Sequence, residues 1–194
     1  MDRNQLQELF FIAPIVNLPS IFQNGILSHT RAENLPHRSV ALQPVQDKRA
    51  QVVIPNGPRL HEYANLYICA RNPMLFKRKA EPICVLGVSP EVVDWNGVVI
   101  SDSNAGSNYV RFAAAPAGLQ IVDYDMTFAE SWRDSDQLAY WRKSAAKCAE
   151  VLVPDRVDPR FILKIYVPSD TVQTQVAPLA SGRPVVVDGH MFFL

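Results

Sequence analysis

Late in the chain a carboxylate stands directly before an apolar run, in the stretch Lys147-Cys148-Ala149-Glu150-Val151-Leu152-Val153-Pro154-Asp155. The Val-Leu-Val segment predicts a short buried strand over 151–153. A carboxylate beside such a strand loses hydration unless it has a partner, and perturbed carboxylates are concentrated in active sites. The segment alone leaves two interpretations of Glu150 open: a surface group that points to water, or a functional group.

Length and composition describe an ordinary globular protein. The chain has 194 residues, 48% hydrophobic and 20% charged, which suits one domain over residues 1–194 with a substantial core. Asp2 stands in the N-terminal segment and no long apolar core follows a basic start, so this segment is not a secretory signal. No stretch approaches the roughly 18 apolar residues of a spanning helix. We therefore expect a cytoplasmic protein with no membrane partner.

Cysteine and histidine positions argue against a metal centre. Cys69, Cys84 and Cys148 lie far apart, each among apolar residues, which is typical of buried free thiols. The four histidines show no ligand spacing either. We predict no metal.

Charge is balanced in sum but uneven along the chain. Formal net charge is zero, yet 31–79 contains nine Lys or Arg against three acids, and 81–130 contains seven acids against Arg111 alone. A neutral protein can still present one positive face, and phosphate contacts need only that local field. The alternative is that the blocks fold onto several faces and average out, and the sequence leaves both possibilities open.

Short strands and short helices alternate between dense turns. Strands are predicted at 10–12, 66–70, 82–86, 97–100, 151–153, 161–167 and 185–187. Helices are predicted at 17–22, 72–76, 123–132 and 136–147, with single helical turns near 47–49 and 89–91. The remainder of 31–58 is expected to be a long irregular loop, and 101–108 a polar loop. This mixed order predicts an α+β fold rather than a doubly wound α/β fold.

Three common chemistries are excluded by spacing. The chain has no Walker phosphate loop, no Gly-x-Gly-x-x-Gly fingerprint after a strand and no Gly-x-Ser-x-Gly elbow. What remains is an arginine in a long loop, a glutamate on a late strand and tyrosines between them.

Three segments of the chain carry a resemblance to a known family. They are Phe11-Ile12-Ala13-Pro14-Ile15-Val16-Asn17-Leu18-Pro19-Ser20-Ile21, His61-Glu62-Tyr63-Ala64-Asn65-Leu66-Tyr67-Ile68-Cys69-Ala70-Arg71-Asn72-Pro73-Met74-Leu75 and Ala149-Glu150-Val151-Leu152-Val153-Pro154-Asp155. In this order they resemble the DarT family of DNA ADP-ribosyltransferase toxins from DarT–DarG toxin–antitoxin systems. The resemblance spans roughly residues 10–167. It implies an ADP-ribosyltransferase-like α+β fold with a split mixed β-sheet and an NAD-binding cleft. It also implies transfer of ADP-ribose from NAD⁺ onto a base, typically thymidine, in single-stranded DNA, reversed by a macrodomain antitoxin of the DarG type.

The resemblance assigns two catalytic residues, Glu150 and Arg49. Breaking the nicotinamide–ribose bond develops positive charge on the sugar, which a carboxylate stabilises, and a carboxylate can also accept the proton that the attacking base loses. Arg49 matches the active-site arginine of the loop that covers NAD⁺. A guanidinium there can hold either the NAD⁺ diphosphate or the developing charge on the base, and the sequence leaves both roles open.

The first strand departs from the family pattern. Family members carry a histidine there, in a His-Ile-Thr stretch that holds NAD⁺, where this chain has Phe11-Ile12-Ala13. Phenylalanine stacks but donates no hydrogen bond, so cofactor contacts at Phe11, Ile12 and Ala13 are expected to involve backbone groups. Ser20 and Ser28 fall where the family contacts the cofactor.

Aromatic and polar residues supply the other candidates. Tyr63 and Tyr67 are candidates for the NAD⁺ cleft, although an aromatic in a buried strand is also typical of a core. The stretch 107–149 resembles the long loop that shapes the DNA-binding side of the family. The DNA-binding candidates are Asn104, Asn108, Arg111 and Trp141; Trp132 and Tyr140 fit base stacking and core packing equally.

Two alternative functions remain beside this expectation. One is enzymatic: transfer to another base, to RNA or to protein, or simple NAD⁺ hydrolysis. The other is a degenerate member that binds DNA or nucleotide without turnover, which Phe11 suggests.

Overall fold

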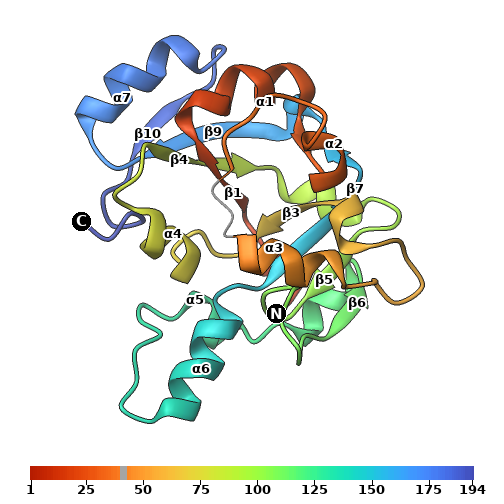
Figure 1. Cartoon of the computed structure of the whole chain (residues 1–194). Helices are drawn as coiled ribbons and strands as arrows, with labels where there is room; N and C mark the ends of the chain where they lie inside the picture. The colour runs from red at the N-terminus through yellow and green to blue at the C-terminus, as the bar shows by residue number, and fades with distance from the viewer. Residues whose placement is uncertain (40–42) are drawn as a thin grey trace.

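The computed structural model of the protein describes residues 1–39 and 43–194. Its main sheet contains eight strands in the order β10-β9-β4-β1-β3-β7-β5-β6 (Figure 1). Their bounds are Val185–Val187 (β10), Ile162–Val167 (β9), Ile83–Val88 (β4), Leu9–Pro14 (β1), Tyr63–Tyr67 (β3), Glu150–Pro154 (β7), Val99–Ser101 (β5) and Phe112–Ala114 (β6). A separate two-stranded ladder pairs β2 (Ile26–Leu27) with β8 (Arg156–Val157).

The main sheet is divided between β1 and β3. β1 pairs with β4 along its whole length, but it meets β3 only at Phe10↔Tyr67. β3 in turn pairs with β7 along its whole length, from Tyr63↔Pro154 to Tyr67↔Glu150. The halves β10-β9-β4-β1 and β3-β7-β5-β6 therefore diverge beyond Phe10 and Tyr67. Because β9 and β10 run parallel while the other pairs are antiparallel, the sheet is mixed, and the α+β fold with a split mixed sheet is confirmed.

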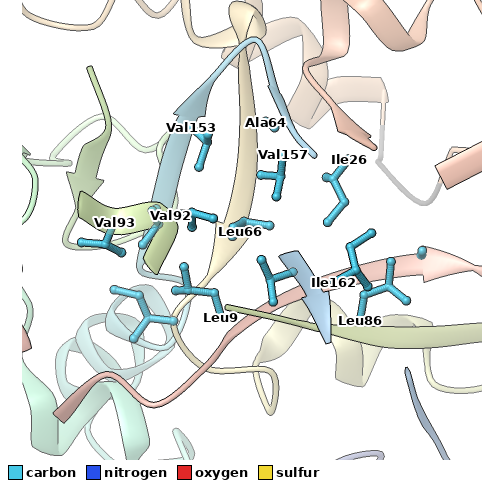
Figure 2. Packing of buried hydrophobic residues seen from close by; sticks show 14 of the residues in the cluster. Leu9, Ile26, Ala64, Leu66, Leu86, Val92, Val93, Val153, Val157 and Ile162 are labelled. Carbon is cyan, nitrogen blue, oxygen red and sulfur yellow. The ribbon is translucent and has the colours of Figure 1, made fainter. Parts of the chain in front are cut away.

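The largest hydrophobic core lies against one face of the sheet and contains side chains from both halves. Figure 2 shows side chains from the two halves packed in this cluster, among them Leu9, Leu86 and Ile162 from one half and Ala64, Leu66 and Val153 from the other. The period of two along β3 puts the buried side chains of Ala64 and Leu66 in this core. It turns Tyr63, Asn65 and Tyr67 toward the opposite side, where a cavity opens.

The helices are short and connect the strands. Their bounds are Leu18–Asn24 (α1), His29–Ala32 (α2), Gln43–Ala50 (α3), Pro73–Arg78 (α4), Tyr124–Phe128 (α5), Gln137–Ala146 (α6) and Asp170–Val176 (α7). Short 3₁₀ segments cover Arg3–Gln5 (η1), Ile15–Asn17 (η2), Leu60–Glu62 (η3), Pro90–Asp94 (η4), Ala117–Ile121 (η5), Pro159–Phe161 (η6) and Ala177–Leu179 (η7). Figure 1 shows α5 and α6 at the end of the molecule opposite α7. Within the described residues, no helix combines the length and apolar character needed to cross a bilayer.

Several local signals predicted the elements correctly. The helix predicted at 72–76 is α4: Asn72 caps it by accepting a hydrogen bond from the backbone N–H of Leu75 at 3.0 Å, and Pro73 occupies the first turn. Gly25 ends α1 with φ at 91°, a left-handed conformation that glycine adopts without strain. These positions follow from local backbone chemistry, which a sequence carries directly.

Other predicted bounds were wrong where tertiary contacts decide the structure. The loop expected over 31–58, with one helical turn near 47–49, contains the end of α2 and the whole of α3. The predicted turn is part of this eight-residue helix, which the side chain of Arg49 anchors from its last turn. The strand expected at 66–70 is β3 at Tyr63–Tyr67, since apolar burial continues beyond the point where pairing stops. The helix expected over 123–132 ends at Phe128. β6 was not predicted from the sequence, because a strand of three residues is too short to show an alternation of apolar and polar residues.

Candidate active site

Glu150 is fully buried and is held by Arg49 in a two-pronged ion pair. Nη1 of Arg49 donates to Oε1 of Glu150 at 3.0 Å, and Nη2 donates to Oε2 at 3.0 Å. The backbone N–H of Ala105 adds a third hydrogen bond to Oε1 at 3.1 Å. Burial opposes the charge on Arg49, but the Glu150 carboxylate outweighs it and the pKa of Arg49 is raised. Of the two interpretations that the sequence left open, Glu150 is therefore not a surface group that points to water: its carboxylate is buried and paired with Arg49.

Three elements bring this pair together. Glu150 begins β7, directly opposite Tyr67 on β3 and Ser101 on β5, while Arg49 reaches it from α3. Burial and the nearby Glu150 carboxylate raise the pKa of Tyr67 well above its ordinary value. Tyr67 therefore keeps its phenolic proton at neutral pH and stands opposite Glu150 as an uncharged side chain.

The turn that follows β5 positions both charges. The side-chain oxygen of Asn104 accepts hydrogen bonds from Nη1 of Arg49 at 3.4 Å and from the backbone N–H of Gly106 at 2.8 Å. A Cβ at Gly106 would lie 2.9 Å from Cγ of Arg49, so glycine permits the close approach of the turn to this side chain. The structure places Asn104, a DNA-binding candidate by sequence, against the Arg49–Glu150 pair.

A cavity of about 390 Å³ opens where the two halves of the sheet diverge. Its walls come from β1, α1, the chain around α2 and α3, β3 and α4. The polar and charged residues that line it are Asn17, Ser20, His29, His37, Arg38, Ser39, Gln46, Arg49, His61, Tyr63, Asn65, Tyr67, Lys77 and Asn104. Within the described part of the chain, no aspartate or glutamate lines this cavity. We call it the cationic cavity.

Most of the predicted cofactor residues lie on the wall of the cationic cavity. They are Phe11, Ile12, Ser20, Arg49, Tyr63 and Tyr67. Ala13 is instead fully buried in the largest core, and its carbonyl accepts a weak hydrogen bond from the Cys84 thiol at 3.6 Å. Ser28 is also buried away from the wall, where its hydroxyl caps α2 by accepting from the backbone N–H of Arg31.

Sequence reasoning missed several residues of the cavity wall. Asn65 lies there because the polar side chain alternates with the buried Ala64 and Leu66, a period of two that the sequence displays. His29 and His61 also lie there, with ring centroids 4.1 Å apart. No sequence signal places these two rings together, because they are brought into contact by the packing of α2 on η3. Burial, with smaller effects from His29 and Arg49, lowers the pKa of His61.

A second hollow, of about 470 Å³, lies between the β5–β6 loop and α6. It brings together the predicted residues Arg111 and Trp141, and adds Tyr109 and Arg142. Nε of Arg111 donates to Asp102 at 2.6 Å, and Trp141 is 58% exposed. We call this the aromatic hollow.

The other sequence candidates lie elsewhere. Asn108 is exposed on the β5–β6 loop and does not line the aromatic hollow. Trp132 is buried against Phe76 and Phe193, with edge-to-face ring contacts, so core packing is its role. Tyr140 is half-buried on α6.

The cysteines are free and buried, as predicted. Burial raises the pKa of Cys84 and Cys148 to about 12, so both thiols are protonated at neutral pH. Over residues 1–39 and 43–194, no group of three or more His, Cys, Asp or Glu side chains is placed to hold a metal ion.

The split sheet, the cavity at its division and the buried Arg–Glu pair define an ADP-ribosyltransferase fold. Residues 10–193 match the family described as "ssDNA thymidine ADP-ribosyltransferase, DarT". The chain belongs to the DarT family.

Relatives and solved structures agree with this assignment. The chain is 30% identical to a DNA ADP-ribosyl transferase of Thermus aquaticus, over 91% of this chain and 82% of the relative. It is 32% identical to a DNA ADP-ribosyl transferase–DNA ADP-ribosyl glycohydrolase fusion protein of Thermosipho africanus, with 98% of this chain aligned, and it spans 50% of that relative's length. DarT of Thermus sp. 2.9 in complex with ADP-ribosylated ssDNA superposes with a TM-score of 0.83 at 25% identity, over 97% of both chains. The same protein in complex with NAD⁺ gives a TM-score of 0.78 over 97% of this chain and 98% of that one.

Proposed function

We propose that the chain transfers ADP-ribose from NAD⁺ onto a thymidine base in single-stranded DNA, as the toxin of a DarT–DarG type toxin–antitoxin system. The observation that carries the proposal is the buried Arg49–Glu150 pair beside the cationic cavity. A fully buried carboxylate is costly without a partner, and its attachment to an arginine on the wall of a ligand-sized cavity favours a catalytic role. The Thermus DarT structures carry NAD⁺ and ADP-ribosylated ssDNA as ligands.

In the proposed reaction Glu150 acts on the sugar and on the base. Its carboxylate stabilises the positive charge that develops on the ribose as nicotinamide leaves, and then accepts the proton that the attacking base nitrogen loses. NAD⁺ is the ADP-ribose donor and supplies the leaving group.

Arg49 stands between Glu150 and the cationic cavity. Arg49 lines the cavity, whereas Glu150 has no exposed surface. Arg49 must therefore shift when the substrates bind, so that the carboxylate meets the sugar. Its attachment to Glu150 favours a role at the reacting groups over a role at the diphosphate, the two roles that the sequence left open.

The aromatic hollow is the proposed DNA contact beside this centre. Exposed aromatic rings stack on unpaired bases and arginines contact phosphates, and the hollow offers Tyr109 and Trp141 with Arg111 and Arg142. The turn that contains Asn104 connects the hollow to the Arg49–Glu150 pair.

The proposed partners follow from the same family. A macrodomain antitoxin of the DarG type would remove the modification, which fits the Thermosipho relative, a protein named as a fusion of a transferase with a glycohydrolase. We infer a cytoplasmic location, where NAD⁺ and single-stranded DNA are both accessible.

The test is an acceptor comparison. The protein is incubated with NAD⁺ and single-stranded oligonucleotides that differ only in their base content, then with RNA, protein and water as alternative acceptors. The proposal expects an ADP-ribose mass increase on thymidine-containing DNA. An increase only on RNA or protein, or release of nicotinamide with no acceptor, would replace it by one of the other enzymatic functions. Absence of turnover together with retained DNA binding would identify a non-catalytic binding protein.

A further inference from the structure

The cationic cavity contains more positive charge than its catalytic pair uses. Three cations line it, Arg38, Arg49 and Lys77, and no acid lines it within the described part of the chain. The aromatic hollow, in contrast, combines Arg111 and Arg142 with Asp102 and Asp123. A cavity with such a charge bias attracts an anionic ligand.

Before a ligand binds, the charge of Arg49 is already paired with Glu150, so Arg49 is not the cation that attracts an anionic ligand. Both of its terminal nitrogens donate to Glu150 at 3.0 Å, and the pair leaves little net charge at that point of the wall. Arg38 and Lys77 have no carboxylate partner among residues 1–39 and 43–194, and both are exposed to solvent. They are the unneutralised cations of the cavity.

The two cations are held on different walls. Arg38 is fixed to Asn17, the residue that precedes α1, by a reciprocal pair of hydrogen bonds. The backbone N–H of Arg38 donates to the side-chain oxygen of Asn17 at 3.0 Å, and the Asn17 amide donates to the Arg38 carbonyl at 2.7 Å. Lys77 lies in the last turn of α4, which the buried Asn72 anchors by donating to the Cys69 carbonyl at 2.9 Å. Neither contact uses the charged end of Arg38 or Lys77, which stays available to a ligand.

We propose that Arg38 and Lys77 bind the diphosphate of NAD⁺ between them, an assignment that rests on the proposed function. A diphosphate is the anionic part of NAD⁺, and guanidinium and ammonium groups bind phosphate oxygens through charge-assisted hydrogen bonds. The assignment leaves Arg49 for the reacting groups, in agreement with its attachment to Glu150.

The test is binding of ADP-ribose, measured by calorimetry on the full chain at two salt concentrations. Arg38→Gln and Lys77→Gln are each expected to weaken ADP-ribose about tenfold, the equivalent of one charge-assisted hydrogen bond. Both are also expected to reduce the salt dependence of binding, because a screened charge has been removed. Arg38→Lys, which keeps the charge, should retain most of the affinity.

Two matched variants control for general charge and for folding. Lys79→Gln removes a cation from the same end of α4, where Nζ lies 4.8 Å from the Phe76 ring centroid and away from the cavity wall. Arg31→Gln removes an exposed arginine that pairs with Asp155 at 2.6 Å. Both should bind ADP-ribose as the unaltered chain does, and all variants should keep its melting temperature.

Unchanged affinity and unchanged salt dependence in Arg38→Gln and Lys77→Gln would overturn the assignment, as would an equal loss in the two controls. ADP-ribose binding requires no acceptor, so this result is independent of the transfer reaction. If ADP-ribose binding depends on both cations while no oligonucleotide is modified, the diphosphate site stands and the proposed function fails. If DNA is modified while the two variants bind ADP-ribose as tightly as the unaltered chain, the proposed function stands and the diphosphate site fails.

Discussion

At the scale of the residue, the Arg49–Glu150 pair links stability to chemistry. Each charge is buried, so each depends on the other for compensation, while the N–H of Ala105 alone cannot replace the guanidinium. The arrangement holds the Glu150 carboxylate inside the protein against the Arg49 guanidinium. It also makes the two residues a coupled unit whose effects on folding are not additive.

This coupling predicts the outcome of a double-mutant cycle. Arg49→Met leaves the Glu150 carboxylate buried without its partner and is expected to lower the free energy of unfolding by about 3–5 kcal/mol. Arg49→Met combined with Glu150→Gln removes both charges, so it should be less destabilised than the sum of the single changes. Urea unfolding followed by circular dichroism measures the three variants. Strict additivity would show that the pair is not formed in solution.

The contact between His29 and His61 predicts a dependence of stability on pH. Burial, then His29 and Arg49, lower the pKa of His61 below its ordinary value of 6.5. The folded protein then binds fewer protons than the unfolded chain as pH falls through 6.5, so stability present above that pH is lost on acidification. His61→Gln should lose less stability than the unaltered chain between pH 7.5 and 5.5, while His37→Gln, with an exposed ring, should behave as the unaltered chain does. Identical pH profiles for the unaltered chain and His61→Gln would contradict the assignment.

Sequence patterns identified individual site residues unevenly. Glu150 stood out because a carboxylate beside an apolar strand is unusual, whereas Tyr63 and Tyr67 fitted either the NAD⁺ cleft or a core. The partner of Glu150 was found through the family resemblance, since Arg49 is 101 positions away and no local pattern joins them. Composition alone could not assign the role of Asn104, because a polar loop residue looks the same whether it contacts DNA or orients an arginine.

At the scale of the element, short segments without strong internal preferences are held by side-chain contacts. α3 is only eight residues long and mostly exposed, and its buried residue is Arg49. The sequence predicted only a single helical turn near 47–49 within a long loop, because formation of the full helix depends on a contact with a distant strand rather than on apolar periodicity. α4, in contrast, carried its cap and its proline in the sequence and was predicted correctly.

A buried lysine at the end of α6, just before the catalytic strand β7, joins α6 to α5. Lys147 lies three residues before Glu150. Its Nζ donates to the carbonyls of Thr127 at 3.1 Å and Ala129 at 2.6 Å. The hydroxyl of Thr127 donates back to the carbonyl of Ala146 at 3.2 Å. These bonds satisfy carbonyls at the end of α5 that the helix itself leaves unpaired.

Lys147→Met tests this connection. The substitution leaves buried carbonyls without donors, which is expected to cost about 1–3 kcal/mol of stability. It should also reduce transfer to an oligonucleotide more than it reduces ADP-ribose binding, because α6 carries Trp141 while the cationic cavity lies elsewhere. Lys143→Met, which removes an exposed contact to Asp134, is the matched control. Equal losses in transfer and in ADP-ribose binding would contradict a role in positioning the DNA side.

At the scale of the whole molecule, the uneven charge of the sequence becomes an uneven distribution over two sites. The basic block supplies Arg38, Arg49 and Lys77 to the cationic cavity, and the acidic block supplies Asp102 and Asp123 to the aromatic hollow. The sequence also allowed the positive and negative blocks to mix so that their charges cancel on every face. The cationic cavity does not show such mixing, because cations line it without acids among the described residues. The fold class was predictable because mixed short elements imply α+β, whereas the division between β1 and β3 depends on pairing that no local pattern reports.

The largest core joins strands from both halves of the sheet, so we expect the chain to unfold as one domain. Circular dichroism and tryptophan fluorescence should report a single coincident transition in urea. Two separated transitions would show that the halves fold independently.

The central claim is that Glu150 at the divided sheet transfers ADP-ribose to DNA. The most direct measurement is mass spectrometry of a single-stranded oligonucleotide containing one thymidine, after incubation with NAD⁺ and either the unaltered chain or Glu150→Gln. We predict one ADP-ribose increment with the unaltered chain, and a rate at least about 100-fold lower with Glu150→Gln, the scale expected for loss of a charge-stabilising group. Equal modification by both proteins, or none by the unaltered chain on any oligonucleotide, would contradict the claim.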